Sequence, residues 1–402
     1  MKNIFLAVCC LVLIHRTGIS QVSGAKGWYK NANVILDGAG GVLSWVDVSG
    51  LGINFLQIDS LERPKYVLSS DINGNSLYFD GVNDFLSVGD TFDLLMNDRT
   101  YVILMKDTFS DGCYFSKGKA AVGNNRINFL TQGVNTYWLY EDLGSHNNIS
   151  PTQNKNFKIV LFEVDRGAMV SNYYRNFQLL NQKTGLEGAL YNFQSSDRCI
   201  IGARNNSTDL GETFHFSGNI AEVIIFDKVL SSSEKDTLKS YFINEYSPPV
   251  NIGVNIIRTN YCDTVLKAKK KWFTNYLWQD GSTADSLVVS KTGWYSAIVT
   301  DVFGFTSSDS VHVQFPIITQ PADTVFCQNG SLTWDTQLNN SDFNFLWSDS
   351  STDSLLNITL GGDYWLKVTD SQGCFKYSDT LTIGVDSFPV LTNLGLDKTI
   401  CQ

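Results

Sequence analysis

Six polar and aromatic residues fall in two stretches of the sequence and carry the chemistry that recognises sugars. Aromatic rings stack on the C–H faces of sugars, while amide and guanidinium groups hydrogen-bond to hydroxyls. The residues are Asn124, Arg126, Trp138, Tyr140, His146 and Arg204. We predict that they form a ligand-binding surface. The alternative is that Trp138 and Tyr140, which share one face of a strand, belong to the hydrophobic core.

Paired acids of the kind that hydrolyse glycosides are missing from the pattern. Such a pair must face one cleft, about 5 Å apart in retaining enzymes and up to about 9 Å apart in inverting ones. Glu222 and Asp227 are five positions apart, and an odd separation along a strand puts them on opposite faces. No Gly-x-Ser-x-Gly motif and no Cys/His grouping is present. We therefore expect no enzyme activity. If the chain is an enzyme, glycosidase is the activity that we expect.

Aspartates close together in sequence raise the question of a metal. Calcium takes six to eight oxygen ligands, often from loops. Asp80 and Asp84 are the candidate ligands, followed by Asp90 and Asp93, but the regular spacing of an EF-hand loop is not present. Solvated turns are the alternative. We expect no cofactor, with calcium at Asp80 and Asp84 as the exception to test.

The N-terminus has the pattern of a secretory signal peptide. Lys2 precedes an apolar run over residues 4–14, which is followed by His15, Arg16 and small residues. A helix needs about 20 apolar residues to span a bilayer, so this run is too short for an uncleaved anchor. We predict a signal peptide over residues 1–20, a secreted protein at the cell surface, and no membrane insertion.

Composition narrows the fold class and the partners. The net charge is −10, from 40 Asp and Glu against 30 Lys and Arg, which argues against nucleic acid as a partner. Charged residues make up only 17%, whereas aromatic residues reach 13% and glycines number 32. This composition is typical of short strands joined by polar turns, so we predict an all-β protein.

The last third of the chain repeats itself in a fixed register. Leu-Trp at 277–278, Gly-Trp-Tyr at 293–295 and Val-Thr-Asp at 299–301 recur 69 residues later as 346–347, Gly-Asp-Tyr at 362–364 and 368–370. This period suits a small β-sandwich. We predict one repeat over residues 248–316, a second over 317–390, and the start of a truncated third over 391–402.

The region before the repeats has many short strands and one helix. Strand-like segments rich in branched and aromatic residues alternate with Gly, Asn, Asp and Ser, which favours a double-sheet jelly roll over residues 21–247. Ser231 stands three residues before Glu234, which is the spacing of a capping box. We therefore expect a helix from about Ser232 to Tyr246. Trp45, Phe79, Trp278 and Trp347 alternate with polar neighbours, so we expect them in the core.

Separate motifs in the first region support a resemblance. The segments 41–50 (GVLSWVDVSG), 77–86 (LYFDGVNDFL) and 216–227 (FSGNIAEVIIFD) resemble parts of concanavalin A-like, laminin-G-type jelly rolls in secreted proteins of the Bacteroidetes. The repeats resemble PKD- and immunoglobulin-like units of adhesins exported by type IX secretion. The resemblance implies a jelly-roll β-sandwich head followed by tandem Ig-like β-sandwich repeats, with the type IX machinery as a partner. It says little about function, because such jelly rolls serve many functions.

The cysteines of the repeats suggest one disulfide. Cys374 opens the last strand of the second repeat and Cys327 lies on its first strand, so we predict that these two cysteines pair and close the sandwich. Phe305 stands in the first repeat where the second has Cys374, which leaves Cys262 without the equivalent partner. Whether Cys113 and Cys199 pair stays open.

The sequence predicts a secreted surface adhesin or glycan-binding protein, with the head displayed on spacer repeats. Its partner would be a glycan or a surface protein. Two alternatives remain. The chain is a structural stalk that mediates protein contacts, or it is the accessory region of a polysaccharide-degrading enzyme.

Overall fold

The computed structural model describes residues 24–93, 97–108, 111–118, 127–132, 136–141, 144–149, 155–185, 197–206 and 211–386. The predicted signal peptide and the predicted third repeat lie outside these ranges. The chain forms two compact units, of which the first runs to residue 249 and includes residues 270–274 and 300–306. The second comprises residues 250–269, 275–299 and the chain from 307 onward. None of the described helices has the length and apolar character that crossing a bilayer requires.

The first unit is built almost entirely from strands, which confirms the predicted all-β fold class. Its strands are β1 (Ala25–Leu36), β2 (Val42–Asp47), β3 (Phe55–Leu56), β4 (Lys65–Leu68), β5 (Asn75–Asp80), β6 (Leu86–Val88), β7 (Arg99–Asp107), β8 (Gly112–Lys117), β9 (Ile127–Gln132), β10 (Thr136–Glu141), β11 (Gly144–Ile149), β12 (Lys158–Asp165), β13 (Val170–Arg175), β14 (Gln178–Thr184), β15 (Cys199–Ile201), β16 (Arg204–Asn205), β17 (Glu212–Thr213) and β18 (Ser217–Phe226).

A single sheet folds back on itself to make the two layers of the head. Its strand order is β11-β10-β9-β8-β15-β6-β3-β2-β1-β18-β7-β12-β13-β14, with β5 pairing β18 and β4 pairing β5. The ring of Phe129 in β9 stacks on that of Phe162 in β12, with centroids 4.7 Å apart, although many strands separate them within the sheet. The two halves of the sheet therefore face each other as a jelly-roll sandwich.

The space between the layers is filled by aromatic and branched side chains. Trp45 and Phe79 are fully buried there, as the alternating pattern predicted. Turns form at the ends of these strands: the Asp47 carboxylate accepts hydrogen bonds from the backbone and the hydroxyl of Ser49, and Gly81 has a φ of 80°, which favours glycine. Local turn chemistry thus sets the ends of the strands that the core holds together.

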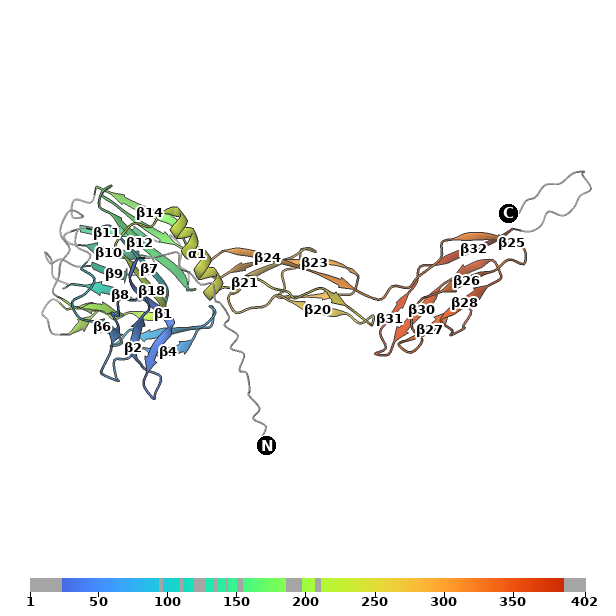
Figure 1. The fold of residues 1–402 in the computed structure, drawn as a ribbon, viewed down its shortest axis with the longest axis horizontal. Helices are drawn as coiled ribbons and strands as arrows, with labels where there is room; N and C mark the ends of the chain where they lie inside the picture. The colour runs from blue at the N-terminus through green and yellow to red at the C-terminus, as the bar shows by residue number, and fades with distance from the viewer. Residues whose placement is uncertain are drawn as a thin grey trace, which may run out of the picture. The chain divides into compact units, whose positions relative to one another are not determined.

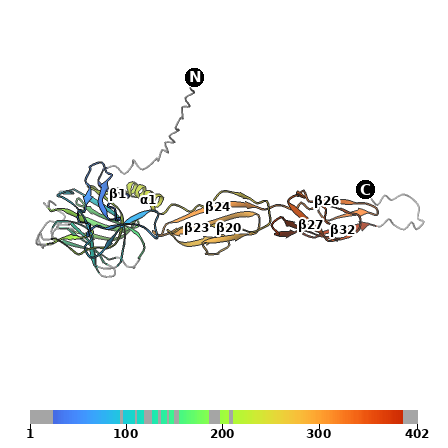
Figure 2. The ribbon, with the colours of Figure 1, turned by 90° about the horizontal axis from the view of Figure 1, so that it is seen from below.

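The helix α1 (Ser232–Tyr246) lies on the outer surface of the sheet, as Figures 1 and 2 show. The predicted capping box is present, since Ser231 and Glu234 satisfy each other's backbone N–H groups. Leu238 and Phe242 bury the inner face of the helix in a second hydrophobic cluster, with Ile224 of β18. One half of the sheet is therefore covered by this helix.

The two predicted repeats are built from small sheets of two to four strands. The strands of the first are β19 (Ile256–Ile257), β20 (Thr264–Lys267), β21 (Phe273–Trp278), β22 (Ser286–Val289), β23 (Gly293–Asp301) and β24 (Thr306–Gln314). Those of the second are β25 (Thr324–Cys327), β26 (Leu332–Asp335), β27 (Phe343–Trp347), β28 (Leu355–Ile358), β29 (Gly362–Tyr364), β30 (Leu366–Asp370), β31 (Phe375–Tyr377) and β32 (Leu381–Asp386).

Matching residues play matching roles in the two repeats. Trp278 and Trp347 are both buried, which confirms their predicted place in the cores. The hydroxyl of Tyr295 donates a hydrogen bond to the carbonyl of Lys291, four residues upstream, and Tyr364 does the same to the carbonyl of Leu360. Each tyrosine thereby ties a strand to the turn that precedes it.

The predicted Cys327–Cys374 disulfide is wrong. Cys374 is bonded to Cys262, with Sγ atoms 2.01 Å apart, and Cys327 is in a disulfide that does not involve Cys374. The reason is the position of the segment before β20, where the backbone N–H of Tyr261 donates a hydrogen bond to the Asp370 carboxylate at 2.7 Å. This bond brings Cys262 beside the turn that carries Cys374. The disulfide therefore joins successive repeats instead of closing one sandwich.

Candidate ligand-binding groove

The predicted sugar-binding residues are only partly described. Asn124 and Arg126 lie outside the described residues, and Trp138, Tyr140 and His146 are described only through the backbone of their strands. Strand register places His146 opposite Leu139 and Tyr140 opposite Asn128. Whether these five residues bind a sugar therefore stays a prediction.

Arg204 is described, and it lies in the short hairpin formed by β16 and β17. Its guanidinium lies over the ring of Phe214, with the centroid 4.8 Å away. The neighbouring residue Asn205 donates a hydrogen bond to the carbonyl of Arg198. Through Asn205, the hairpin connects Arg204 to Arg198, which lines a groove of the head.

The groove opens on the half of the sheet that α1 does not cover. Its floor is the pair of facing residues Leu56 in β3 and Ser87 in β6. Their neighbours Phe55 and Leu86 are buried in the core. The alternation of each strand therefore turns Leu56 and Ser87 outward. The lining residues are Asn54, Leu56, Gln57, Ile58, Asp59, Glu62, Phe85, Ser87, Val88, Gly89, Arg198 and Glu212.

The groove of the head has a volume of about 640 Å³, whereas a second hollow, in the second unit, has a volume of about 350 Å³. The volume of the groove is within the usual range for small-molecule sites. Two aliphatic side chains of the lining are exposed, Leu56 at 48% and Ile58 at 85%. They offer an apolar surface beside the polar lining.

Among the described residues that line the groove, Arg198 is the one cation, and three groups hold its guanidinium. Its guanidinium forms an ion pair with Glu212 and donates a hydrogen bond to the side-chain oxygen of Asn205. The same guanidinium lies over the ring of Phe85, 5.6 Å from the centroid. Because its side chain is still 37% exposed, Arg198 presents a fixed donor surface to the groove.

The opposite wall is a loop whose shape is fixed by its own side chains. Gln57 donates hydrogen bonds to the carboxylate of Glu62 and to the carbonyl of Phe85. Asp59 accepts a hydrogen bond from the backbone N–H of Leu61. The wall is therefore organised before any ligand arrives, which reduces the entropy lost on binding.

The charges of the groove favour an uncharged ligand. Asp59, Glu62 and Glu212 are acidic, and Arg198 is the single base among the lining residues. An anionic ligand would meet this excess of negative charge, whereas hydroxyl groups can donate to carboxylates and accept from the guanidinium. The lining is thus suited to a neutral polyhydroxylated molecule.

Glu222, the acid that sequence reasoning considered for catalysis, is fully buried between β18 and α1. Tyr241 and Tyr246 donate hydrogen bonds to its carboxylate, and so does the indole N–H of Trp28. Burial raises its pKa to about 7. Asp227 instead forms an ion pair with Lys26. The two acids do not share a cleft, and Glu222 anchors the helix to the sheet.

A shift of strand register explains how a carboxylate reaches this position. The pairing of β18 with β7 slips between Ile220 and Glu222. Ala221 belongs to the cluster beneath α1, and Glu222 also contacts residues of that cluster. The bulge therefore places two consecutive side chains toward the helix, which simple alternation along the strand does not predict.

The candidate calcium ligands have roles in turns and ion pairs. Asp80 accepts hydrogen bonds from the backbone of Val82 and Asn83, and Asp84 accepts one from the backbone of Asp80. Burial raises the pKa of Asp84 to about 6. Within the described ranges, the geometry of a three-residue metal site occurs only at Cys262, Asp370 and Cys374, whose two sulfurs are bonded to each other.

Asp90 and Asp93 both form ion pairs with the side chain of Lys117. The ammonium of Lys117 lies 2.6 Å from a carboxylate oxygen of Asp90 and 3.4 Å from one of Asp93. It also donates a hydrogen bond to the carbonyl of Asp197. The Lys117 side chain is almost completely buried, so this ion pair locks the loop after β6 onto the sandwich.

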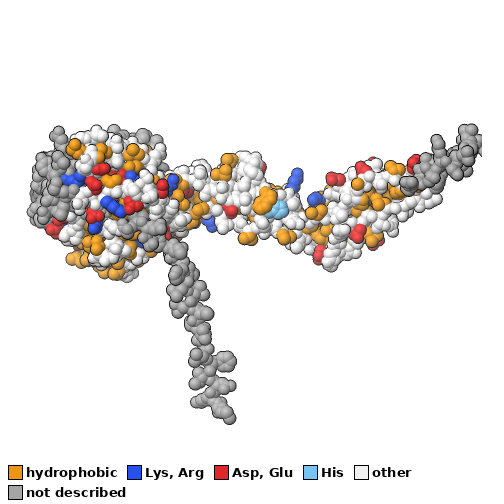
Figure 3. Space-filling model, turned by 45° about the horizontal axis from the view of Figure 1, so that its top comes forward, with side chains coloured by type: hydrophobic (Ala, Val, Ile, Leu, Met, Phe, Trp, Pro, Cys, Tyr) orange, Lys and Arg blue, Asp and Glu red, His pale blue; other side chains and the backbone are white. Residues whose placement is uncertain are grey.

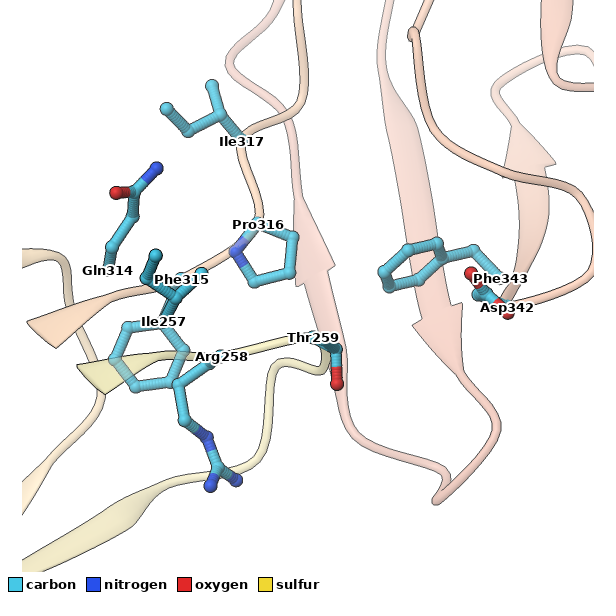
Figure 4. Close-up of a pocket in the computed structure, with 9 residues that line it drawn as sticks. All are labelled: Ile257, Arg258, Thr259, Gln314, Phe315, Pro316, Ile317, Asp342 and Phe343. Carbon is cyan, nitrogen blue, oxygen red and sulfur yellow. The ribbon is translucent and has the colours of Figure 1, made fainter.

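The second hollow, in the second unit, is less suited to a ligand. Figure 4 shows that the guanidinium of Arg258 points away from Pro316 and Phe343. That guanidinium donates hydrogen bonds to the side chain of Asn260 and to the carbonyl of Cys262. Its charge therefore supports the segment before the disulfide and does not serve the hollow.

Sequence reasoning missed the groove because its lining comes from distant segments. Residues 54–62, 85–89, 198 and 212 become neighbours only through the pairing of β3, β6 and β15. The local signal was limited to a polar loop around Glu62 and to the polar segment that starts at Arg204. Neither has the spacing of a known motif.

Comparisons with known proteins give similarity to solved β-sandwich structures. No family model matches the chain, and no curated protein matches it. The carbohydrate-binding module CBM40 of Ruminococcus gnavus IT-sialidase, bound to α2,3-sialyllactose, is 12% identical, with a TM-score of 0.33, and the match covers 41% of this chain and 95% of that chain.

Two further solved structures are similar at the same level. Domain 4 of the extracellular arabinanase AbnA from Geobacillus stearothermophilus, in complex with arabinotriose, is 14% identical over 54% of this chain and 98% of that chain, with a TM-score of 0.38. A SAP-like pentraxin from Limulus polyphemus is 14% identical over 42% of this chain and 82% of that chain, with a TM-score of 0.34. These values are too low to transfer a ligand to this chain.

Proposed function

We propose that the head binds a neutral glycan in the groove between β3, β6 and β17 and does not cleave it. The observation that carries this proposal is the fixed Arg198–Glu212 pair beside exposed Leu56 and Ile58. A sugar ring has polar hydroxyls and apolar C–H faces, so it matches both parts of the lining. Figure 3 shows acidic and basic side chains interspersed on the visible face of the head, without a basic block.

The positions of the acids support the proposal of binding without hydrolysis. A glycosidase needs a general acid with a raised pKa in the cleft. Within the described part of the chain, burial raises the pKa of Glu222, Asp84 and Asp301, and none of these lines the groove. The acids that do line it are engaged, since Glu212 pairs with Arg198 and Glu62 accepts from Gln57.

The N-terminal pattern and the repeats extend the proposal to the whole chain. We infer a secreted adhesin of the cell surface, exported by the type IX route, in which the repeats act as spacers for the head. Single sugar contacts are weak, with dissociation constants of about 1 mM to 1 μM, and many copies on one surface would raise the avidity.

A glycan array and a pull-down on insoluble neutral polysaccharides test this function, with release of reducing sugar measured in the same samples. We expect retention of the intact chain without release of sugar. Release that survives purification would assign an enzyme, and capture of a protein without retention on any glycan would favour the structural stalk.

A further inference from the structure

Three aromatic side chains form an exposed cluster on the second repeat. Trp365 is 37% exposed, Phe375 54% and Tyr377 53%. The centroids of Trp365 and Tyr377 are 5.8 Å apart, and those of Phe375 and Tyr377 are 5.7 Å apart. Phe375 and Tyr377 lie in β31, the edge strand of the sheet β27-β30-β31. We call these three residues the aromatic cluster.

The fold of the repeat does not require these rings. At a displacement of 69 residues, the first repeat has Ser296 in place of Trp365, Thr306 in place of Phe375 and Ser308 in place of Tyr377. The first repeat forms the same kind of sandwich with these small polar residues. The aromatic cluster therefore adds exposed apolar surface that packing does not explain.

One lysine accompanies the aromatic cluster. The ammonium of Lys367 lies over the ring of Phe375, 4.3 Å from the centroid, and Lys367 pairs with Tyr377 in the register of β30 and β31. The first repeat has Ile298 at this position. Positive charge is thus added together with the rings, in a chain whose net charge is −10.

We infer that the aromatic cluster and Lys367 form a second binding site, which takes an acidic polysaccharide such as a chain of uronic acids. The rings supply stacking faces for sugars, and the ammonium supplies a partner for the carboxylates. A stable protein interface buries roughly 800 Å² on each partner. A three-residue edge strand with one neighbouring tryptophan is small for that purpose, whereas a sugar chain needs only a few rings.

This site differs from the proposed groove in the charge of its ligand. The acidic groove of the head favours a neutral glycan, while Lys367 of the second repeat favours an acidic one. Failure of one site can therefore be distinguished from failure of the other by the choice of polysaccharide.

The test transfers the residues of the first repeat to the second in the full-length chain, as Trp365→Ser, Phe375→Thr and Tyr377→Ser together. Binding to immobilised polygalacturonate is measured at low salt, with uncharged dextran as the control matrix. We expect retention of the wild-type chain on polygalacturonate and a loss of at least about tenfold in the triple variant, because all three stacking faces are removed. Added salt should weaken the wild-type binding.

Lys367→Ile is the second variant, because the first repeat carries Ile298 at that position, and it should also reduce retention on polygalacturonate. If circular dichroism shows that the triple variant does not fold, Lys367→Ile tests the proposed site on its own. Unchanged retention in folded variants, or no retention of the wild-type chain, would overturn the inference. Loss of self-association in sedimentation velocity, without any effect on polygalacturonate, would assign the cluster to a contact between copies and would also overturn it.

Discussion

The Sγ atom of Cys262, in the first repeat, is bonded to the Sγ atom of Cys374, in the second. The two residues are 112 positions apart, so the bond crosses the connection between the repeats. A cross-link of about 100 residues contributes about 4 to 5 kcal/mol in the chain-entropy model. We expect Cys262→Ser with Cys374→Ser to lower the free energy of unfolding of the repeats by about this amount, measured in denaturant.

Peptide mapping without reduction checks the same bond directly. We expect one peptide pair that contains Cys262 and Cys374. A pair that joins Cys374 to Cys327 would contradict the structure. Cys113 and Cys199 are free and buried, and burial raises the pKa of each thiol, so both should resist alkylation until the head unfolds.

Glu222 should make the head less stable as the pH rises. Its pKa is about 7 in the folded chain against an ordinary value of 4.5, so the folded state binds the proton more tightly. The stabilisation is complete below pH 4.5 and is lost as the pH rises through 7. The shift corresponds to about 3 kcal/mol. Glu222→Gln stays neutral, so its unfolding free energy should lack this decline.

The measurement is denaturant unfolding of the wild type and Glu222→Gln at several pH values between 4.5 and 8. The comparison removes the effect of other groups that titrate in both proteins. Parallel pH profiles would show that Glu222 does not carry a raised pKa. Tyr246→Phe removes one donor to the carboxylate and should raise the pKa further.

Asp301 should be more important for stability than an exposed aspartate in a similar turn. Its carboxylate accepts hydrogen bonds from the backbone of Phe303 and Phe305 and from the hydroxyl of Ser247, all within the first unit. We expect Asp301→Ala to lower the free energy of unfolding by about 2 to 4 kcal/mol, because buried donors lose their acceptor.

Asp280→Ala is the matched control. Asp280 also accepts hydrogen bonds from the residue two positions later, Ser282, but its turn is exposed to solvent. Water can replace those bonds, so the cost should be much smaller than that of Asp301→Ala. Equal costs for the two substitutions, in unfolding by denaturant, would contradict the importance of burial at Asp301.

Local signals in the sequence predicted the elements that depend on neighbouring residues. Ser231 and Glu234 marked the start of α1, and the alternation of Trp45 with polar neighbours predicted its place in the core. Such features need only a few adjacent residues, so their chemistry is visible without the fold.

Features that depend on distant segments could not be predicted in the same way. The cysteine pattern predicted that Cys374 pairs within its own repeat. The sequence does not show the hydrogen bond from Tyr261 to Asp370, which brings Cys262 to Cys374. The sequence does not indicate that Arg198 and Glu212 belong to a binding site, because only the pairing of strands brings them to Ser87. Position in the fold, and not residue type, gives these residues their roles.

Filling the groove of the head tests the central proposal most directly. Ser87→Trp places a large side chain on the groove floor, while Ser70→Trp adds the same side chain at an exposed position outside the groove lining. Retention of the full-length protein on insoluble neutral polysaccharides is the measurement, together with release of reducing sugar. We predict that the wild type and Ser70→Trp are retained without release of sugar and that folded Ser87→Trp is not retained. Equal retention of Ser87→Trp and the wild type would contradict the account.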